Sequence, residues 1–411
     1  MALGIEKISP YVGRLLMGVE ELFDERKLDT GRMGNLLMNT KSVNLPIEDP
    51  VTNGVNAAMP IIRSLSDAQR SSIELVIVGT ESGLDFGKPI STYIADYLQL
   101  PKRCRSFEVK HACYGGTAAL QMALGFINGC PRKNAKALVI AADSSSVAAR
   151  NTYWEPSQGA GSVAMLVGNN AEALAVDYGA NGYYSYEVMD TLRPRANLEA
   201  GDSDLSILSY TTCLEESFKH YSELVEDVDI EKMFRYMVLH TPFAGMVKSA
   251  HRRVMLKALK GAPIQKIESD FEHRVEPSIR FCQSVGNIYS AALYLALCSL
   301  LENQNFDQPE RIGLFSYGSG CASEFYSGVV HPGGANNFKR LGISQMLADR
   351  WHLSIPDYEQ ICDKSVERMS GVQDLKPDTS AYAHIYEAKF EGSDLLVLDQ
   401  IDNFHRKYKW A

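Results

Sequence analysis

Strand-like apolar runs alternate with helical patterns along this 411-residue chain, and this alternation restricts the folds it can adopt. The strand-like runs are residues 75–78, 137–142, 162–167, 236–239 and 311–315, and the helical patterns cover 117–128, 247–260 and 288–302. Such an alternation predicts an α/β architecture. The polar stretch from Asn169 to about Asp204 separates two halves of the pattern, and we interpret it as a connecting excursion.

The composition, with 45% hydrophobic and 22% charged residues, is that of a large globular protein. A net charge of −9 argues against nucleic acid and an anionic membrane surface as partners. The eight cysteines are scattered without a C-x-x-C pair, which favours reduced thiols in a cytoplasmic protein and gives no zinc spacing. The N-terminus lacks a signal-peptide pattern, and no apolar run approaches the roughly 20 residues of a membrane span. We therefore expect a cytoplasmic protein without a metal.

Cys113 is the first candidate for chemistry. The apolar lead 107–109 predicts a strand, and the small and apolar residues after Cys113 predict a helix. A thiol at a helix start lies near backbone N–H groups and the positive end of the helix dipole, which should favour the thiolate. Those amides could also bind the oxyanion of a thioester under attack. The ordinary alternative is a small buried hydrophobic residue.

Three further polar residues stand where predicted strands end or helices begin. Glu81 follows the run 75–78, His240 follows 236–239, and Asn287 precedes the helix 288–302. Alone, they are a solvated carboxylate, a core histidine and a helix cap, respectively. Sites in open α/β sheets gather beyond the carboxyl ends of the strands. Together with Cys113 they predict covalent acyl transfer followed by carbon–carbon bond formation.

The motifs GTES, FEVKHACYGGTAALQMA, LHTPFAGMVKSAHRR, SVGNIYSAALYLAL and LFSYGSG resemble, in this order, those of 3-hydroxy-3-methylglutaryl-CoA (HMG-CoA) synthases. The resemblance runs from about residue 3 to the C-terminus. It implies a thiolase-type five-layer αβαβα fold in one catalytic unit, residues 1–411, with two related halves, and a homodimer. Residues 1–170 would form the half with Glu81 and Cys113, and residues 171–411 the half with His240 and Asn287.

The resemblance also implies a role for each site residue. Cys113 would carry the acetyl group as a thioester, and Glu81 would remove a proton from its methyl group. His240 would polarise the β-ketone of the acceptor and donate a proton. Asn287 would orient the acceptor, and Ser319 would contact acetyl or product oxygens.

The family has two branches, one acting on CoA thioesters and one on chains held by an acyl carrier protein (ACP) in polyketide β-branching. The stretches 86–94, 102–107, 197–206 and 403–410 resemble the second branch. No cofactor would then be bound, because phosphopantetheine arrives on the donor and acceptor ACPs.

Because ACPs are acidic, basic residues should surround the mouth of the pocket. Arg32 is the candidate for donor-ACP contact, and Lys248 for a phosphate of CoA or phosphopantetheine. The other basic candidates are Lys41, Lys102, Arg103, Arg105, Arg252 and Arg253.

Four alternatives remain at this point. The first is an HMG-CoA synthase of the mevalonate pathway, using acetyl-CoA and acetoacetyl-CoA. The second is a β-ketoacyl synthase with Cys, His and Asn, for which Glu81 is not expected. The third is an inactive carrier-binding scaffold. A metal-dependent lyase is disfavoured because the sequence has no cluster with ligand spacing.

Overall fold

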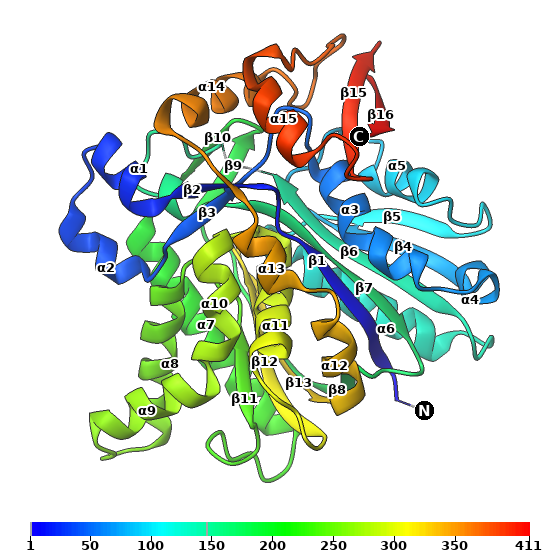
Figure 1. Ribbon diagram of the computed structural model, residues 1–411. Coiled ribbons are helices and arrows are strands. Elements are labelled where there is room, and N and C mark those ends of the chain that lie inside the picture. The colour runs from blue at the N-terminus through cyan, green and yellow to red at the C-terminus, as the bar shows by residue number, and fades with distance from the viewer. Residues whose placement is uncertain (1, 145–146) are drawn as a thin grey trace.

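The computed structural model describes residues 2–144 and 147–411 (Figure 1). Its main feature is a nine-stranded sheet in the order β11-β12-β13-β8-β1-β7-β6-β4-β5. These strands are β1 Gly4–Tyr11, β4 Ile73–Gly79, β5 Arg105–Val109, β6 Lys136–Ser144, β7 Ala160–Gly168, β8 Leu174–Ser185, β11 Tyr236–Leu239, β12 Glu310–Gly318 and β13 Ala322–Val330. The predicted strand runs all lie within them, so the α/β prediction is confirmed.

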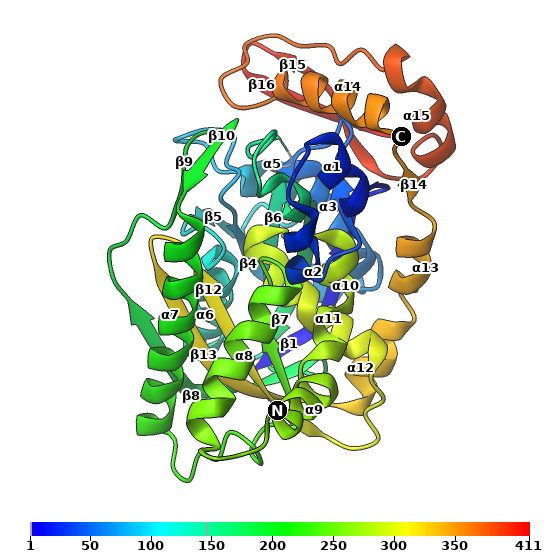
Figure 2. The ribbon, with the colours of Figure 1, turned by 90° about the vertical axis from the view of Figure 1, so that its left-hand side faces the viewer.

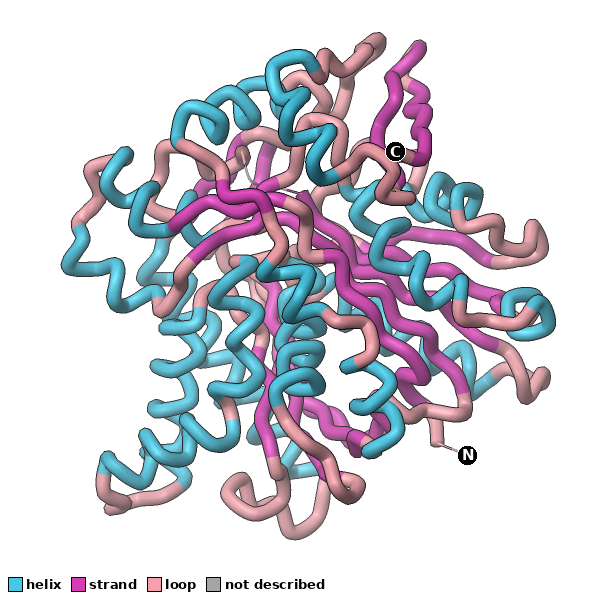
Figure 3. Tube along the Cα trace, in the orientation of Figure 1, coloured by secondary structure: helices cyan, strands magenta, loops and turns pink. Residues whose placement is uncertain are grey.

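Helices cover the sheet (Figure 3). They are α1 Val19–Glu25, α2 Met33–Leu36, α3 Pro50–Arg63, α4 Asp67–Ser71, α5 Ile90–Tyr97, α6 Gly115–Gly129, α7 Ser203–Leu224, α8 Ala244–Ala258, α9 Ile264–Arg274, α10 Glu276–Val285, α11 Ala292–Asn303, α12 Pro332–Lys339, α13 Ile343–Ala348, α14 Ile355–Val366 and α15 Ala383–Lys389. Short 3₁₀ turns are η1 Thr30–Arg32, η2 Glu155–Ser157, η3 Tyr289–Ala291 and η4 Ser380–Tyr382. The remaining strands are β2 Leu15–Gly18, β3 Thr40–Val43, β9 Thr191–Arg195, β10 Leu198–Gly201, β14 Trp351–His352, β15 Leu396–Asp402 and β16 His405–Trp410.

The two halves of the sheet repeat one topology. The order β1-β7-β6-β4 in the first half matches β8-β13-β12-β11 in the second, and β5 extends the first half. In each half the third and fourth strands of this order are parallel and the others antiparallel. Antiparallel pairing of β1 with β8 joins the halves. This repeat agrees with the expected two related halves.

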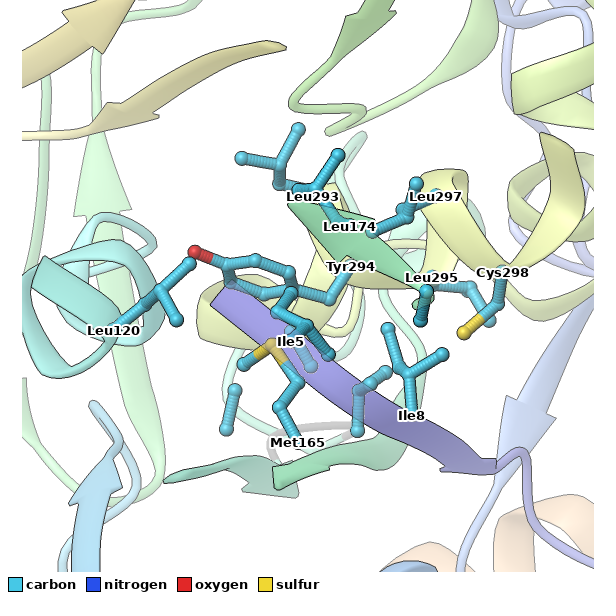
Figure 4. Packing of buried hydrophobic residues seen from close by; sticks show 14 of the residues in the cluster. Ile5, Ile8, Leu120, Met165, Leu174, Leu293, Tyr294, Leu295, Leu297 and Cys298 are labelled. Atoms are coloured by element: carbon cyan, nitrogen blue, oxygen red, sulfur yellow. The ribbon is translucent and has the colours of Figure 1, made fainter. Parts of the chain in front are cut away.

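Alternation along the strands explains the layers. On β6, Ala137, Val139 and Ala141 face a central cluster shared with α6 and α11, whereas Leu138 and Ile140 face an outer cluster with α3 and α5. The second half packs its other face on α7 and α8. Each fully buried aliphatic side chain contributes about 1.5–3 kcal/mol. Figure 4 shows part of the central cluster. With outer helices on both sides and helices between the two halves of the sheet, the order of layers is αβαβα.

One expectation about residues 169–204 is wrong. Residues 174–185 form β8, a central strand of the sheet, and residues 191–201 form the β9–β10 hairpin. Glycines at 179 and 182 gave β8 the sequence pattern of a loop. Gly182 is required because a Cβ there would lie 2.1 Å from the backbone nitrogen of Tyr221 on α7.

The C-terminal residues 351–411 return to the first half. The strand β14 pairs with β2, and side chains of β15 and β16 join the outer cluster with α3 and α5. In Figure 2 the helices α14 and α15 and the β15–β16 hairpin lie across the top of the molecule. Among the described helices, none has the length and apolar character needed to cross a membrane.

Candidate active site

The repeated topology places the four main candidates at equivalent positions. Glu81 follows β4 and His240 follows β11, the matching strands of the two halves. Cys113 precedes α6 and Asn287 precedes η3 and α11, the matching helices of the central layer. The fold therefore supplies two strand-end side chains and two helix-start side chains to one region.

Glycines allow these loops to touch. A Cβ on Gly79 would lie 2.5 Å from the carbonyl carbon of Gly115, and one on Gly116 would lie 2.2 Å from the carbonyl oxygen of Ser290. A Cβ on Gly318 would lie 2.4 Å from the backbone nitrogen of Tyr114. The turn that carries Cys113 therefore contacts the loop of Glu81, the turn after Asn287 and the loop of Ser319.

Cys113 is partly exposed, at the end of a tight turn in which Ala112 has a φ of 41°. Burial, together with the carboxylates of Glu81, Asp143 and Glu199, raises the pKa of the thiol well above its ordinary value. The expected thiolate at the helix start is therefore wrong for the free protein. The amide N–H groups of residues 114 and 115 are also used within the turn, donating to the carbonyls of residues 111 and 112.

Glu81 has a mixed electrostatic environment. Burial raises the pKa of Glu81 to about 8, and the carboxylates of Asp143 and Glu199 add to this, while the guanidinium of Arg193 opposes it. Arg193 Nη2 lies 3.1 Å from Glu81 Oε1. A carboxylate with a pKa near neutrality is suited to general base catalysis.

Asp143, at the end of β6, organises the loop of Glu81. Its Oδ1 accepts hydrogen bonds from the backbone N–H groups of Glu81 and Ser82 at 2.9 and 3.0 Å, and from the hydroxyls of Thr80 and Ser82. Its Oδ2 accepts from the backbone N–H and hydroxyl of Ser290. A single buried carboxylate thus fixes the loop after β4 to the turn that precedes α11.

The β9–β10 hairpin contributes two residues that no sequence motif indicated, Arg193 and Glu199. Arg193 Nη2 lies 2.9 Å from Glu199 Oε2, and Glu199 Oε1 accepts from the side-chain amide of Gln158 at 2.7 Å. The hairpin reaches the site only through the tertiary fold. The sole local signal was that residues 197–206 resemble a branch of the family.

His240 is almost fully buried and carries a neutral ring. Its backbone N–H donates to Phe315 at 2.8 Å, and its carbonyl accepts from the hydroxyl of Tyr210 at 2.7 Å. Burial lowers the pKa of His240 to about 3. Its Nε2 is buried without a hydrogen-bond partner among the described residues. A neutral imidazole can relay a proton between two substrate groups.

Asn287 and Ser319 border the same region. The side-chain carbonyl of Asn287 accepts from the backbone N–H of Tyr289 at 2.8 Å, and its backbone bonds to residues 157 and 159. Ser319 is partly exposed in the turn after β12. The next residue, Gly320, donates its N–H to Asp190 at 3.0 Å.

The basic candidates lie outside this cluster. Arg32 is 67% exposed on η1, with its guanidinium carbon 5.8 Å from the centre of the Tyr153 ring. Lys248, on α8, pairs with Glu268 at 2.9 Å. Lys41 is wrong as a surface candidate because it is completely buried and donates to a main-chain carbonyl.

The described residues contain no group of three or more His, Cys, Asp or Glu side chains arranged to hold a metal ion.

The comparisons with known proteins agree with this geometry. The models described as hydroxymethylglutaryl-coenzyme A synthase N terminal and C terminal match residues 58–172 and 257–410. The polyketide biosynthesis 3-hydroxy-3-methylglutaryl-ACP synthase PksG of Bacillus subtilis is 49% identical over 99% of both chains. The hydroxymethylglutaryl-CoA synthase of Enterococcus faecalis is 34% identical over 89% of this chain and 93% of its own.

Solved structures show the same likeness. The HMG synthase of the curacin biosynthetic pathway, in complex with acetyl donor-ACP, has a TM-score of 0.97 and 49% identity over 100% of both chains. MvaS in complex with 3-hydroxy-3-methylglutaryl coenzyme A has a TM-score of 0.87 and 29% identity over 100% of this chain and 99% of its own.

Fold and site together define an acyl-transferring condensing enzyme with a thiolase-like fold. The chain belongs to the hydroxymethylglutaryl-CoA synthase family. His240 lies between the two matched ranges, so its place in the site rests on the fold.

Proposed function

We propose that the protein is a 3-hydroxy-3-methylglutaryl-ACP synthase of polyketide β-branching. The observation that carries the reaction type is a carboxyl group, Glu81, with a side chain 15% exposed, beside a partly exposed thiol, Cys113, on two loops in backbone contact. The choice of branch is supported by the full-length likeness to PksG and to the curacin HMG synthase, whose structures include complexes with donor ACP.

The first step is acetyl transfer. The sulfur of Cys113 bonds to the acetyl carbonyl carbon, and the bond from that carbon to the carrier's sulfur breaks. The proton of the thiol passes to the departing carrier thiol, and neutral His240 is the relay. A neutral relay is needed because burial and the neighbouring carboxylates raise the pKa of the Cys113 thiol and favour its protonated form.

The second step forms the carbon–carbon bond. Glu81 takes a proton from the acetyl methyl group, and the enolate carbon attacks the β-ketone of the acceptor chain. His240, acting again as a neutral relay, donates a proton to the new alkoxide and takes up the proton that Glu81 removed, so both residues return to their starting state. Asn287 and Ser319 hold the acceptor and the acetyl oxygen. Water then cleaves the Cys113 thioester, which yields a carboxylate on the product and the free thiol.

The carriers supply phosphopantetheine, so no resident cofactor is part of the proposal. Arg32 is the proposed donor-ACP contact, since it is exposed and only weakly paired, with 3.7 Å to Asp29. Arg32→Glu should slow loading from acetyl-ACP and leave loading from acetyl-CoA unchanged. Lys248 can contact a phosphate only if its ammonium group first breaks the ion pair with Glu268.

A homodimer and a cytoplasmic location complete the proposal. The strand β5 is at an edge of the sheet, and Phe107 on it and Met122 on α6 are 36% and 58% exposed. An open sheet edge with exposed apolar side chains on it and beside it is suited to pairing with a second copy. All eight cysteines are free thiols, in agreement with a reducing compartment.

The test is a full turnover. The protein is mixed with acetyl-loaded donor ACP and acetoacetyl-loaded acceptor ACP, and intact mass follows the acceptor. We expect the acceptor to gain one acetyl unit and one water, and Cys113→Ala and Glu81→Gln to abolish this gain. Faster turnover of acetyl-CoA with acetoacetyl-CoA would favour the mevalonate alternative. Condensation that survives Glu81→Gln would favour a β-ketoacyl synthase, and inactivity with every substrate would favour a scaffold.

A further inference from the structure

Arg193 joins the proposed base to the β9–β10 hairpin. Its side chain is 11% exposed, and its Nη2 contacts Glu81 Oε1 at 3.1 Å and Glu199 Oε2 at 2.9 Å. Its guanidinium carbon lies 4.8 Å from the centre of the Tyr289 ring, a cation–π distance. The fourth contact is a longer hydrogen bond from Arg193 Nη1 to the hydroxyl of Ser82 at 3.4 Å. Contacts with four residues therefore fix the Arg193 side chain.

The charged and titratable groups around Glu81 come from several elements. They are Asp143 at the end of β6, Arg193 on β9, Glu199 on β10, the thiol of Cys113 before α6, and Arg368 after α14, which lines the same small cleft. Arg193 is the cation in direct contact with Glu81. Without it, Glu81 would share a buried site with two other carboxylates, an arrangement that favours protonation and leaves the side chain unanchored.

We propose that Arg193 is the positioning residue for Glu81, and that the bridge Glu199–Arg193–Glu81 favours the ionised form of this carboxyl group and fixes it beside the acetyl group on Cys113. The proposal rests on the proposed function, because it assumes that Glu81 abstracts the methyl proton. The proposal therefore gives the β9–β10 hairpin a role in proton abstraction by Glu81.

Substitutions at Arg193 and at Glu199 should shift the ionisation of Glu81 in opposite directions. Replacing Arg193 by methionine removes a positive neighbour of Glu81, so deprotonation of Glu81 should need a higher pH. Replacing Glu199 by glutamine removes a negative neighbour, so deprotonation should occur at a lower pH. A side chain that merely anchored the hairpin would slow the reaction without moving its pH dependence.

The experiment measures exchange of the acetyl methyl protons in D₂O. Acetyl-enzyme is formed first, so that the thiol of Cys113 is blocked and does not titrate, and deuterium in the acetylated peptide is read by mass spectrometry from pH 5 to 10. Glu81 takes a proton from the methyl group, exchanges it with solvent and returns a deuteron. No acceptor is present, so condensation does not interfere.

For Arg193→Met we expect the pH midpoint of exchange to rise by at least about 1 unit, with exchange at pH 7 reduced at least about tenfold. Arg193→Lys keeps the charge and should restore most of the midpoint. Glu199→Gln should lower it. Arg195→Met, the same kind of change at an exposed position of the same strand, should behave as the parent.

An unchanged midpoint in Arg193→Met would overturn the proposal. If that variant does not fold, Glu199→Gln decides, since an unchanged or raised midpoint there contradicts the bridge. If the parent protein is never acetylated, the proposed function fails instead. The ionisation of Glu81 is then followed by infrared difference spectra of the free protein against Glu81→Gln, and a shift in Arg193→Met still tests the bridge.

Discussion

Asp143→Asn is the substitution whose effect the structure defines most closely. Both oxygens of Asp143 accept hydrogen bonds, Oδ1 from the loop at Glu81 and Ser82 and Oδ2 from the turn at Ser290. Asparagine keeps the shape, but its amide nitrogen cannot accept. If that nitrogen faces the turn, the backbone N–H of Ser290 loses its acceptor. If it faces the loop, the backbone N–H groups of Glu81 and Ser82 lose theirs.

The magnitude follows from these counts. A buried donor left unsatisfied costs about 1–3 kcal/mol, and the bonds that remain lose their charge assistance, about 0.5–1.5 kcal/mol. We therefore expect Asp143→Asn to lower the free energy of unfolding by about 2 to 4 kcal/mol. Because the loop holds Glu81, methyl-proton exchange should also slow.

Urea denaturation at matched protein concentration measures this loss, with Ser82→Ala as control. That change removes a hydroxyl that donates to Asp143 and accepts a long bond of 3.2 Å from the backbone N–H of Ser144, but it leaves Asp143 intact, so its cost should stay below that of Asp143→Asn. A free energy of unfolding for Asp143→Asn within about 0.5 kcal/mol of the parent would refute the assignment of Asp143 as the link between the loop and the turn.

Three other predictions follow from the site. Exchange of the acetyl methyl protons should rise with pH through a midpoint near 8, because Glu81 acts as a base only when deprotonated and burial raises its pKa to about 8. A midpoint near 4.5, the ordinary pKa of a glutamate, would contradict this. Histidine NMR signals should show His240 neutral from pH 5 to 9, since its pKa is lowered to about 3, and a titration within this range would count against it. Gly318→Ala should reduce acetyl loading at least tenfold, because the new Cβ would lie 2.4 Å from the nitrogen of Tyr114, whereas Gly129→Ala, with open space at the Cβ, should load normally.

The sequence located those site residues whose position is set by local structure. Cys113, Glu81 and His240 each follow a strand or precede a helix, and an apolar run beside a polar residue is visible without a fold. The five-layer architecture came from the family resemblance, and the alternation of apolar residues established only the α/β class.

Other features depend on contacts between distant segments. Arg193 and Glu199 reach the site because the β9–β10 hairpin folds over the loop after β4. The strand β8 was missed because glycine in sequence suggests a loop, whereas Gly182 allows β8 to pack closely against α7. The protonation of Cys113 was mispredicted because burial, together with three carboxylates from separate elements, raises the pKa of its thiol despite the helix start.

The most direct test of the central claim is acetylation of Cys113. The intact protein is offered acetyl-ACP and acetyl-CoA in parallel, with Cys113→Ser as control, and its mass is followed over time. The account predicts one acetyl group on Cys113, loaded far faster from acetyl-ACP. Efficient loading from acetyl-CoA alone would contradict the polyketide assignment, and no loading from either donor would contradict the cysteine mechanism itself.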